Sequence, residues 1–234
     1  MDLNVNGLQK NPILHSDTTI ANTKKMKTLL DLDNWNRKEH FLFFKQMQEP
    51  FFGVTVDIDC TKAYETSKDL GTSFFIYYLH KTLTAVNAFE NFRYRILNTH
   101  IYVHDRIDGS ATISREDGTF GFSLIEYHSD YTIFEQTALS EIERIQNTTG
   151  LFTREFNEDN VIHFSAIPWL DFTSLSHARS MTFPDSCPKI SFGKMTVSKN
   201  GKRKMPMSVH VHHGLMDAMH VGQMVDYLQE VMNQ

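Results

Sequence analysis

The densest chemistry of the chain lies in one short stretch near its end, which reads His210-Val211-His212-His213-Gly214-Leu215-Met216-Asp217-Ala218-Met219-His220. Alternating apolar residues predict a strand over 205–211 that runs into the start of this stretch, and an apolar stripe predicts a helix from about His220 onward. The histidines therefore lie between the last strand and the last helix, where a rigid strand end presents side chains to a cleft. On that strand His210 and His212 share one face, and His213 points to the other.

Three interpretations of this stretch compete. The histidines could be hydrogen-bonded in a turn, or they could bind a metal ion, since imidazole is a common ligand. The spacing is not that of a helical H-E-x-x-H motif and no C-x-x-C accompanies it, which disfavours a metal site. In the third interpretation His213 is a general base and Asp217 fixes the local geometry. Imidazole titrates near neutrality, so it can take up a proton and return it within one reaction cycle.

Composition narrows the class of protein. Of the 234 residues 41% are hydrophobic and 22% are charged, which is typical of a globular domain. The net charge of -5 leaves no broad cationic field for a nucleic acid. The sequence has no apolar run of about eighteen residues and no apolar signal core, so we expect neither a membrane-spanning helix nor secretion. The two cysteines, Cys60 and Cys187, form no disulfide framework, and we therefore expect a cytoplasmic protein.

The remaining pattern predicts one mixed α+β domain over residues 26–234, after a polar arm over residues 1–25. Apolar spacing predicts a helix over 36–48, and the short polar segment over 61–70 also looks helical. An apolar helix is predicted over 73–87, with Ser73 as its N-cap, and a further helix over 131–147. Alternation predicts strands over 52–58, 101–104, 111–114, 120–127, 161–167 and 190–197. Turns are predicted at Asp108-Gly109, Asp117-Gly118 and Asn200-Gly201. These strands are expected to form one large, mostly antiparallel or mixed sheet.

The pattern H-H-x-x-x-D followed by a small residue resembles the signature of acyl-CoA-dependent transferases. That group includes chloramphenicol acetyltransferases and dihydrolipoamide acyltransferase cores, and the pattern also occurs in peptide-synthetase condensation domains. Three further segments are similar to chloramphenicol acetyltransferases in particular: Trp35-Asn36-Arg37-Lys38-Glu39-His40-Phe41, Ser165-Ala166-Ile167-Pro168-Trp169-Leu170-Asp171-Phe172-Thr173-Ser174 and Met205-Pro206-Met207-Ser208-Val209-His210-Val211-His212-His213. Order and spacing agree over roughly residues 33–234, so the chain is identified as a member of this family.

The resemblance implies four catalytic residues. The second histidine of the pair, His213, corresponds to the general base, which deprotonates the acceptor hydroxyl and returns the proton to the departing CoA thiolate. Ser165 corresponds to the serine that donates a hydrogen bond to the tetrahedral oxyanion, a contribution of roughly 3 kcal/mol. Arg37 and Asp217 correspond to an ion pair that holds the loop carrying His213.

The resemblance also assigns residues to the two substrates. The acceptor pocket is expected to contain Phe43, Phe44, Leu175, His177 and Ser191. Phe44 replaces a tyrosine of the family, and Leu175 and His177 replace a phenylalanine and a leucine. Ser191 keeps the hydroxyl of a family threonine.

The edge of the CoA site is expected at Lys194 and Trp169. A ring that could contact the adenine of CoA is missing there, because Met195 replaces a family tyrosine.

The fold implied by the resemblance is a two-layer α+β sandwich of a large mixed sheet with helices. The chain is expected to form a homotrimer with active sites between subunits, and to use acetyl-CoA as co-substrate without a metal or a tightly bound cofactor. The implied function is acetylation of a hydroxyl of chloramphenicol, which confers antibiotic resistance. Two alternatives stay open, namely the same chemistry on another hydroxyl acceptor, and a catalytically silent trimeric binding protein.

Overall fold

The computed structural model describes residues 27–155, 159–179 and 185–234, so the arm predicted over residues 1–25 lies outside the described residues. The helices are α1 (Lys38–Phe44), α2 (Thr61–Asp69), α3 (Phe74–Ala88), a short 3-10 helix (Glu90–Arg93), α4 (Tyr131–Gln146) and α5 (Ala218–Met232). The strands are β1 (Lys27–Leu29), β2 (Phe51–Asp59), β3 (Tyr94–Leu97), β4 (His100–His104), β5 (Asp108–Ser114), β6 (Phe120–Phe122), β7 (Val161–Ala166), β8 (Lys189–Phe192), β9 (Thr196–Val197) and β10 (Arg203–His212).

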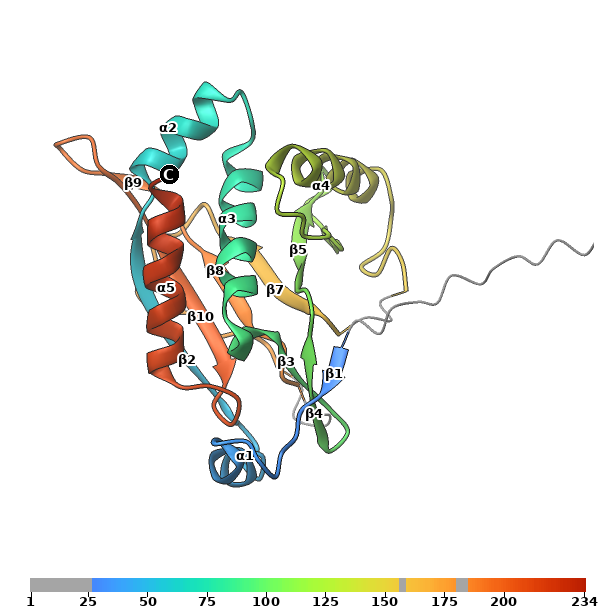
Figure 1. Ribbon diagram of the computed structural model, residues 1–234. Coiled ribbons are helices and arrows are strands. Elements are labelled where there is room, and N and C mark those ends of the chain that lie inside the picture. Colours follow the sequence, from blue (N-terminus) through green and yellow to red (C-terminus); the bar gives the residue numbers. More distant parts are fainter. Residues whose placement is uncertain (1–26, 156–158, 180–184) are drawn as a thin grey trace, which may run out of the picture.

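The larger of two sheets has the strand order β2-β10-β8-β7-β5-β6, with β9 paired to β10. Strands β5, β7 and β8 run parallel, and the other pairs are antiparallel, so the sheet is mixed. Helices α3 and α5 pack side by side over one of its faces, and α4 packs near β5 and β6 (Figure 1). This arrangement of a helical layer on a large mixed sheet confirms the fold predicted from the sequence.

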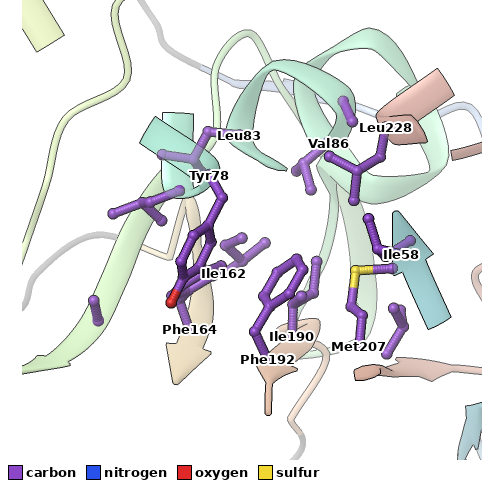
Figure 2. Close-up of a cluster of buried hydrophobic side chains, with 14 of the residues drawn as sticks. Ile58, Tyr78, Leu83, Val86, Ile162, Phe164, Ile190, Phe192, Met207 and Leu228 are labelled. Carbon is purple, nitrogen blue, oxygen red and sulfur yellow. The ribbon is translucent and has the colours of Figure 1, made fainter. Parts of the chain in front are cut away.

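The face of the sheet under α3 and α5 is apolar. Alternate residues of β7, β8 and β10 point into this core, where Figure 2 shows them packed against the two helices: Ile162, Phe164, Ile190, Phe192 and Met207. All are almost fully buried. Each buried side chain of this size contributes roughly 1.5–3 kcal/mol, so this core is the main source of the sheet's stability.

The intervening residues form the opposite, polar face, in two rows. The pairing register aligns Ser165 of β7 with Ser191 of β8 and Ser208 of β10. The next row consists of His163, Lys189, His210 and Gly53, one from each of four strands. A Cβ atom at Gly53 would lie only 2.3 Å from His210 Nε2, so this imidazole packs directly on the backbone of β2.

A second, three-stranded sheet has the order β1-β4-β3 and is joined to the first by Arg95. This side chain is only 2% exposed, and its guanidinium donates to the carbonyl oxygens of Asp159 at 2.9 Å and Val161 at 2.5 Å. It also donates to the carbonyls of Phe92 and Tyr94 on its own side. This buried charge fixes the small sheet to the start of β7, together with the ion pair between Lys27 of β1 and Asp159 at 3.0 Å.

The structure corrects several sequence predictions. Asp108-Gly109 is not a turn but lies within β5, because the Asp108 carboxylate accepts hydrogen bonds from Tyr127 N at 2.8 Å and Asn160 Nδ2 at 2.9 Å. The strand predicted over 190–197 is divided into β8 and β9, and the one over 120–127 ends at 122. Ser73 does precede α3, but its side chain makes no capping hydrogen bond. Strands β1 and β3 were not predicted.

Two glycines test the packing. Gly222 lies inside α5, and a Cβ atom added to it would have no other atom within 4 Å. Gly222→Ala should therefore raise the free energy of unfolding by about 1 kcal/mol, because alanine favours the helix. Replacement of Gly53 by alanine should lower it by roughly 1–3 kcal/mol, because the His210 ring must move. Thermal unfolding followed by circular dichroism measures both changes. Equal melting temperatures for the two variants would contradict the close contact at Gly53.

Candidate active site

The motif around His213 spans the end of a strand, a turn and the start of a helix. The His213 amide donates to Pro50 O at 2.8 Å, which extends the pairing of β10 with the segment before β2 by one residue. The chain then turns, with Leu215 N donating to His212 O at 2.9 Å. Asp217 ends the turn as the N-cap of α5 and accepts the Met219 N–H at 3.1 Å. The histidine is therefore fixed by regular structure on both sides.

The His213 ring has one nitrogen occupied and one open. Nδ1 lies 3.2 Å from Met216 O, and since a carbonyl only accepts, the proton is assigned to Nδ1. Nε2 makes no hydrogen bond within the described residues and keeps its basic lone pair. Phe44 stacks on the ring at 4.0 Å and Phe52 packs at 4.7 Å. The ring is thus held in one orientation with a nitrogen able to accept a proton.

The structure brings Arg37 and Asp217 together beside this ring. Arg37, whose side chain is 9% exposed, donates from Nη1 to Asp217 Oδ2 at 2.7 Å and from Nη2 to the His213 carbonyl at 3.2 Å. His220 Nδ1 lies 2.8 Å from the other Asp217 oxygen. Burial raises the pKa of Asp217, but Arg37 and His220 outweigh it and hold that pKa below its ordinary value. Asp217 therefore stays ionised and anchors the loop.

His212 has a different environment from its neighbour. It is 4% exposed, its Nδ1 accepts the Gly214 N–H at 3.1 Å, and Phe51 packs against it edge-on. Burial is the largest cause that lowers the pKa of His212 to about 4. A neutral imidazole that is engaged in the turn has a structural role.

The structure does not bring Ser165 near His213 within one chain. Ser165 aligns with Ser208 two strands away, which is roughly 10 Å, and His213 lies five residues beyond Ser208, which is roughly 17 Å along the strand. The two residues also lie on opposite faces of the sheet. The Ser165 hydroxyl is half-buried and makes no hydrogen bond with any residue of the described ranges. It is therefore available to a ligand on the polar face.

Several predicted acceptor residues do gather near Ser165. His177 Nε2 lies 3.4 Å from Ser191 Oγ, and the His177 ring meets His210 edge-on at 4.9 Å. The backbone of Leu175 is hydrogen-bonded to His210. Phe43 and Phe44 are not part of this group: Phe44 stacks on His213, and Phe43 is 58% exposed beside it.

The two residues predicted for CoA lie on neighbouring loops. Lys194 N donates to Leu170 O at 2.7 Å, which joins the turn after β8 to the loop after β7. A Cβ at Gly193 would lie 2.7 Å from the same oxygen, so the two loops are in close contact. Trp169 is 72% exposed and Lys194 is also exposed. Both side chains are accessible to a ligand at this end of the sheet.

Sequence reasoning missed the partners that hold these residues. Met216 supplies its carbonyl to His213, and a backbone acceptor leaves no signal in the sequence. His220, three residues after Asp217, was visible in the motif but had no assigned partner. Within the part of the chain that the structure describes, no three His, Cys, Asp or Glu side chains are grouped as metal ligands. Nor is any described helix long and apolar enough to cross a membrane.

Comparison with known proteins agrees over most of the chain. The family model for chloramphenicol acetyltransferase matches residues 26–229. Chloramphenicol acetyltransferase 3 of Escherichia coli is 31% identical over 88% of this chain and 97% of its own length, and chloramphenicol acetyltransferase of Proteus mirabilis is 30% identical over 89% and 96%. A solved chloramphenicol acetyltransferase superposes with a TM-score of 0.82 at 32% identity, over 88% of this chain and 100% of that one. The chain therefore belongs to the chloramphenicol acetyltransferase family and is an acyltransferase.

Proposed function

We propose that this chain is an acetyl-CoA-dependent O-acetyltransferase that acetylates a hydroxyl of chloramphenicol, with His213 as general base. The names of its relatives support this reaction. The observation that carries the proposal is the hydrogen bond between His213 Nδ1 and Met216 O. It leaves Nε2 as the basic atom and holds the ring ready to receive a proton.

In the proposed reaction His213 Nε2 takes the proton of the acceptor hydroxyl as the hydroxyl oxygen attacks the thioester carbonyl of acetyl-CoA. The bond that forms is the new C–O ester bond, and the carbonyl oxygen becomes an oxyanion. Ser165 donates a hydrogen bond to that oxyanion. The intermediate then loses the CoA thiolate, which takes the proton back from the His213 imidazolium. Met216 O and the Phe44 ring stabilise the imidazolium while it exists.

The same proposal requires two chains for each site. His213 and Ser165 lie on opposite faces of one sheet and are too far apart to act on one thioester, so His213 of one subunit must meet Ser165 of another. A homotrimer in which every interface repeats this contact provides three such sites, because a head-to-tail contact that closes forms a ring. His177, Leu175 and Ser191 then line the acceptor pocket opposite the neighbour's Phe43 and Phe44. Lys194 and Trp169 contact CoA.

A second candidate is the same transfer to another hydroxyl compound. It is favoured by Phe44, which has no phenolic hydroxyl for the antibiotic, and by the imidazole of His177 in a pocket otherwise expected to be apolar. A catalytically silent protein is disfavoured, since the ring of His213 and the Arg37–Asp217 pair are intact. Release of CoA thiol, measured with chloramphenicol and with a panel of other alcohols, separates these alternatives.

The two histidines of the motif should differ sharply when replaced. His213→Ala should lower kcat by about 10²–10⁴-fold or more, with acetyl-CoA affinity nearly unchanged, because the general base is lost. His212→Ala should act mainly by lowering stability, since Gly214 N loses its acceptor. The kcat values of the two variants are compared by steady-state kinetics, each corrected for the fraction of folded protein. A larger kcat loss for His212→Ala would place the base one residue earlier.

The Arg37–Asp217 pair should show energetic coupling. Arg37→Met and Asp217→Asn remove the charges while Asn keeps an N-cap acceptor for α5, so the double variant should cost roughly 1–3 kcal/mol less than the sum of the singles. Chemical denaturation measures all four proteins. The exposed pair Lys204–Asp57, at 2.6 Å, is the matched control and should couple by no more than about 1 kcal/mol. Additive losses at Arg37 and Asp217 would contradict a stabilising pair.

If the active sites are shared between subunits, a trimer that combines two different inactive variants should regain part of the activity. His213→Ala and Ser165→Ala chains with different affinity tags are co-expressed, and trimers that hold both tags are isolated. One interface of three then combines an intact His213 with an intact Ser165, so about one third of wild-type activity should return. Trimers of two differently tagged His213→Ala chains are the control. Mixed trimers no more active than their parents would rule out a shared site.

A further inference from the structure

The polar face of the sheet carries a second group of imidazoles that the proposed chemistry does not use. His177 lies above the sheet and touches Ser191 and His210, as described above. His210 Nδ1 is 3.2 Å from Ser208 Oγ, and the His210 ring is further fixed by the Leu175 backbone and the close approach of Gly53. His177 therefore packs against an imidazole, that of His210, whose orientation is fixed.

This group is uncharged near neutral pH. Burial, followed by the proximity of His210, Lys189 and Arg179, lowers the pKa of His177 to about 4. Burial is also the main cause that lowers the pKa of His210. Of the nearby cations, Lys189 bonds to Asp185, and Arg179 lies 3.1 Å from Glu49, although Arg179 Nε and Nη1 have no hydrogen-bond partner among the described residues. The imidazoles of His177 and His210 therefore offer hydrogen bonds and carry no charge of their own near neutral pH.

One ring nitrogen of His177 is open to a ligand. Nε2 faces Ser191, whereas Nδ1 has no partner among residues 27–155, 159–179 and 185–234 and is not fully buried. A neutral imidazole has one N–H donor and one acceptor nitrogen, so Nδ1 can bind an oxygen-bearing group. The register places Ser191 directly beside Ser165. A group bound at Nδ1 therefore lies close to the proposed oxyanion site.

We propose that His177 determines acceptor specificity by hydrogen-bonding a second oxygen of a neutral acceptor, a hydroxyl or carbonyl near the hydroxyl that is acetylated. This inference rests on the proposed function, because it places the acceptor on the polar face beside Ser165. An apolar group at the same place would strip water from the imidazole without replacing its hydrogen bond.

The test compares two alcohols that differ by one hydroxyl, a phenyl-substituted propanediol and the matching phenylpropanol. Their dissociation constants are measured by calorimetry without acetyl-CoA, and their turnover is measured separately by release of CoA thiol. The wild type should bind the diol about two- to tenfold more tightly, the effect of one neutral hydrogen bond. His177→Leu should remove this preference, and His177→Gln, whose amide both donates and accepts, should keep part of it.

His100→Leu is the matched control, because it removes an exposed imidazole on the separate sheet and should keep the full preference. Loss of the preference in His177→Leu with retention in His100→Leu supports the inference. An unchanged preference in His177→Leu, no preference in the wild type, or no binding of either alcohol overturns it. If the wild type binds both alcohols but acetylates neither them nor chloramphenicol, the proposed function fails while the binding ratio still decides the role of His177.

Discussion

The two faces of the central sheet are the constraint from which the site follows. Along β7, β8 and β10, every second residue packs against α3 and α5 and is therefore apolar. The residues between them point to the opposite face of the sheet, where polar side chains are tolerated. Ser165, Ser191 and Ser208 occupy three of these polar positions in one row, and the pairing of the strands alone is enough to align them. A one-residue slip of β8 would exchange Ser191 for a core residue, so the register that stabilises the core also builds the polar wall.

His213 owes its position to a different device, the junction of β10 with α5. The last residues of β10 are paired, Asp217 caps the helix, and Arg37 spans the turn between them. Each contact uses backbone or fixed charge, so the ring has little freedom before a substrate binds. Such preorganisation lets the imidazole accept a proton without first paying for its own orientation.

The sequence revealed the parts of this molecule that have local or motif signals. The long apolar helices, the buried strands and the segments around Arg37, Ser165 and His213 were all visible in it. The short strands β1 and β3 were not predicted, because three or four residues carry too little periodicity. The turn predicted at Asp108-Gly109 was wrong, because tertiary hydrogen bonds to Asp108 override the local preference of these residues for a turn. The contact of His177 with Ser191 joins residues fourteen apart across a loop, which no spacing rule predicts.

Arg95 has a consequence for motion. Its guanidinium keeps its positive charge, and separating the small sheet from β7 would deprive this buried cation of two of the four carbonyls that solvate it. Relative sliding of the two sheets is therefore costly. The segment over 171–179, which carries Leu175 and His177, has no regular secondary structure, so we expect the pocket to adapt to a larger acceptor there sooner than in the strands.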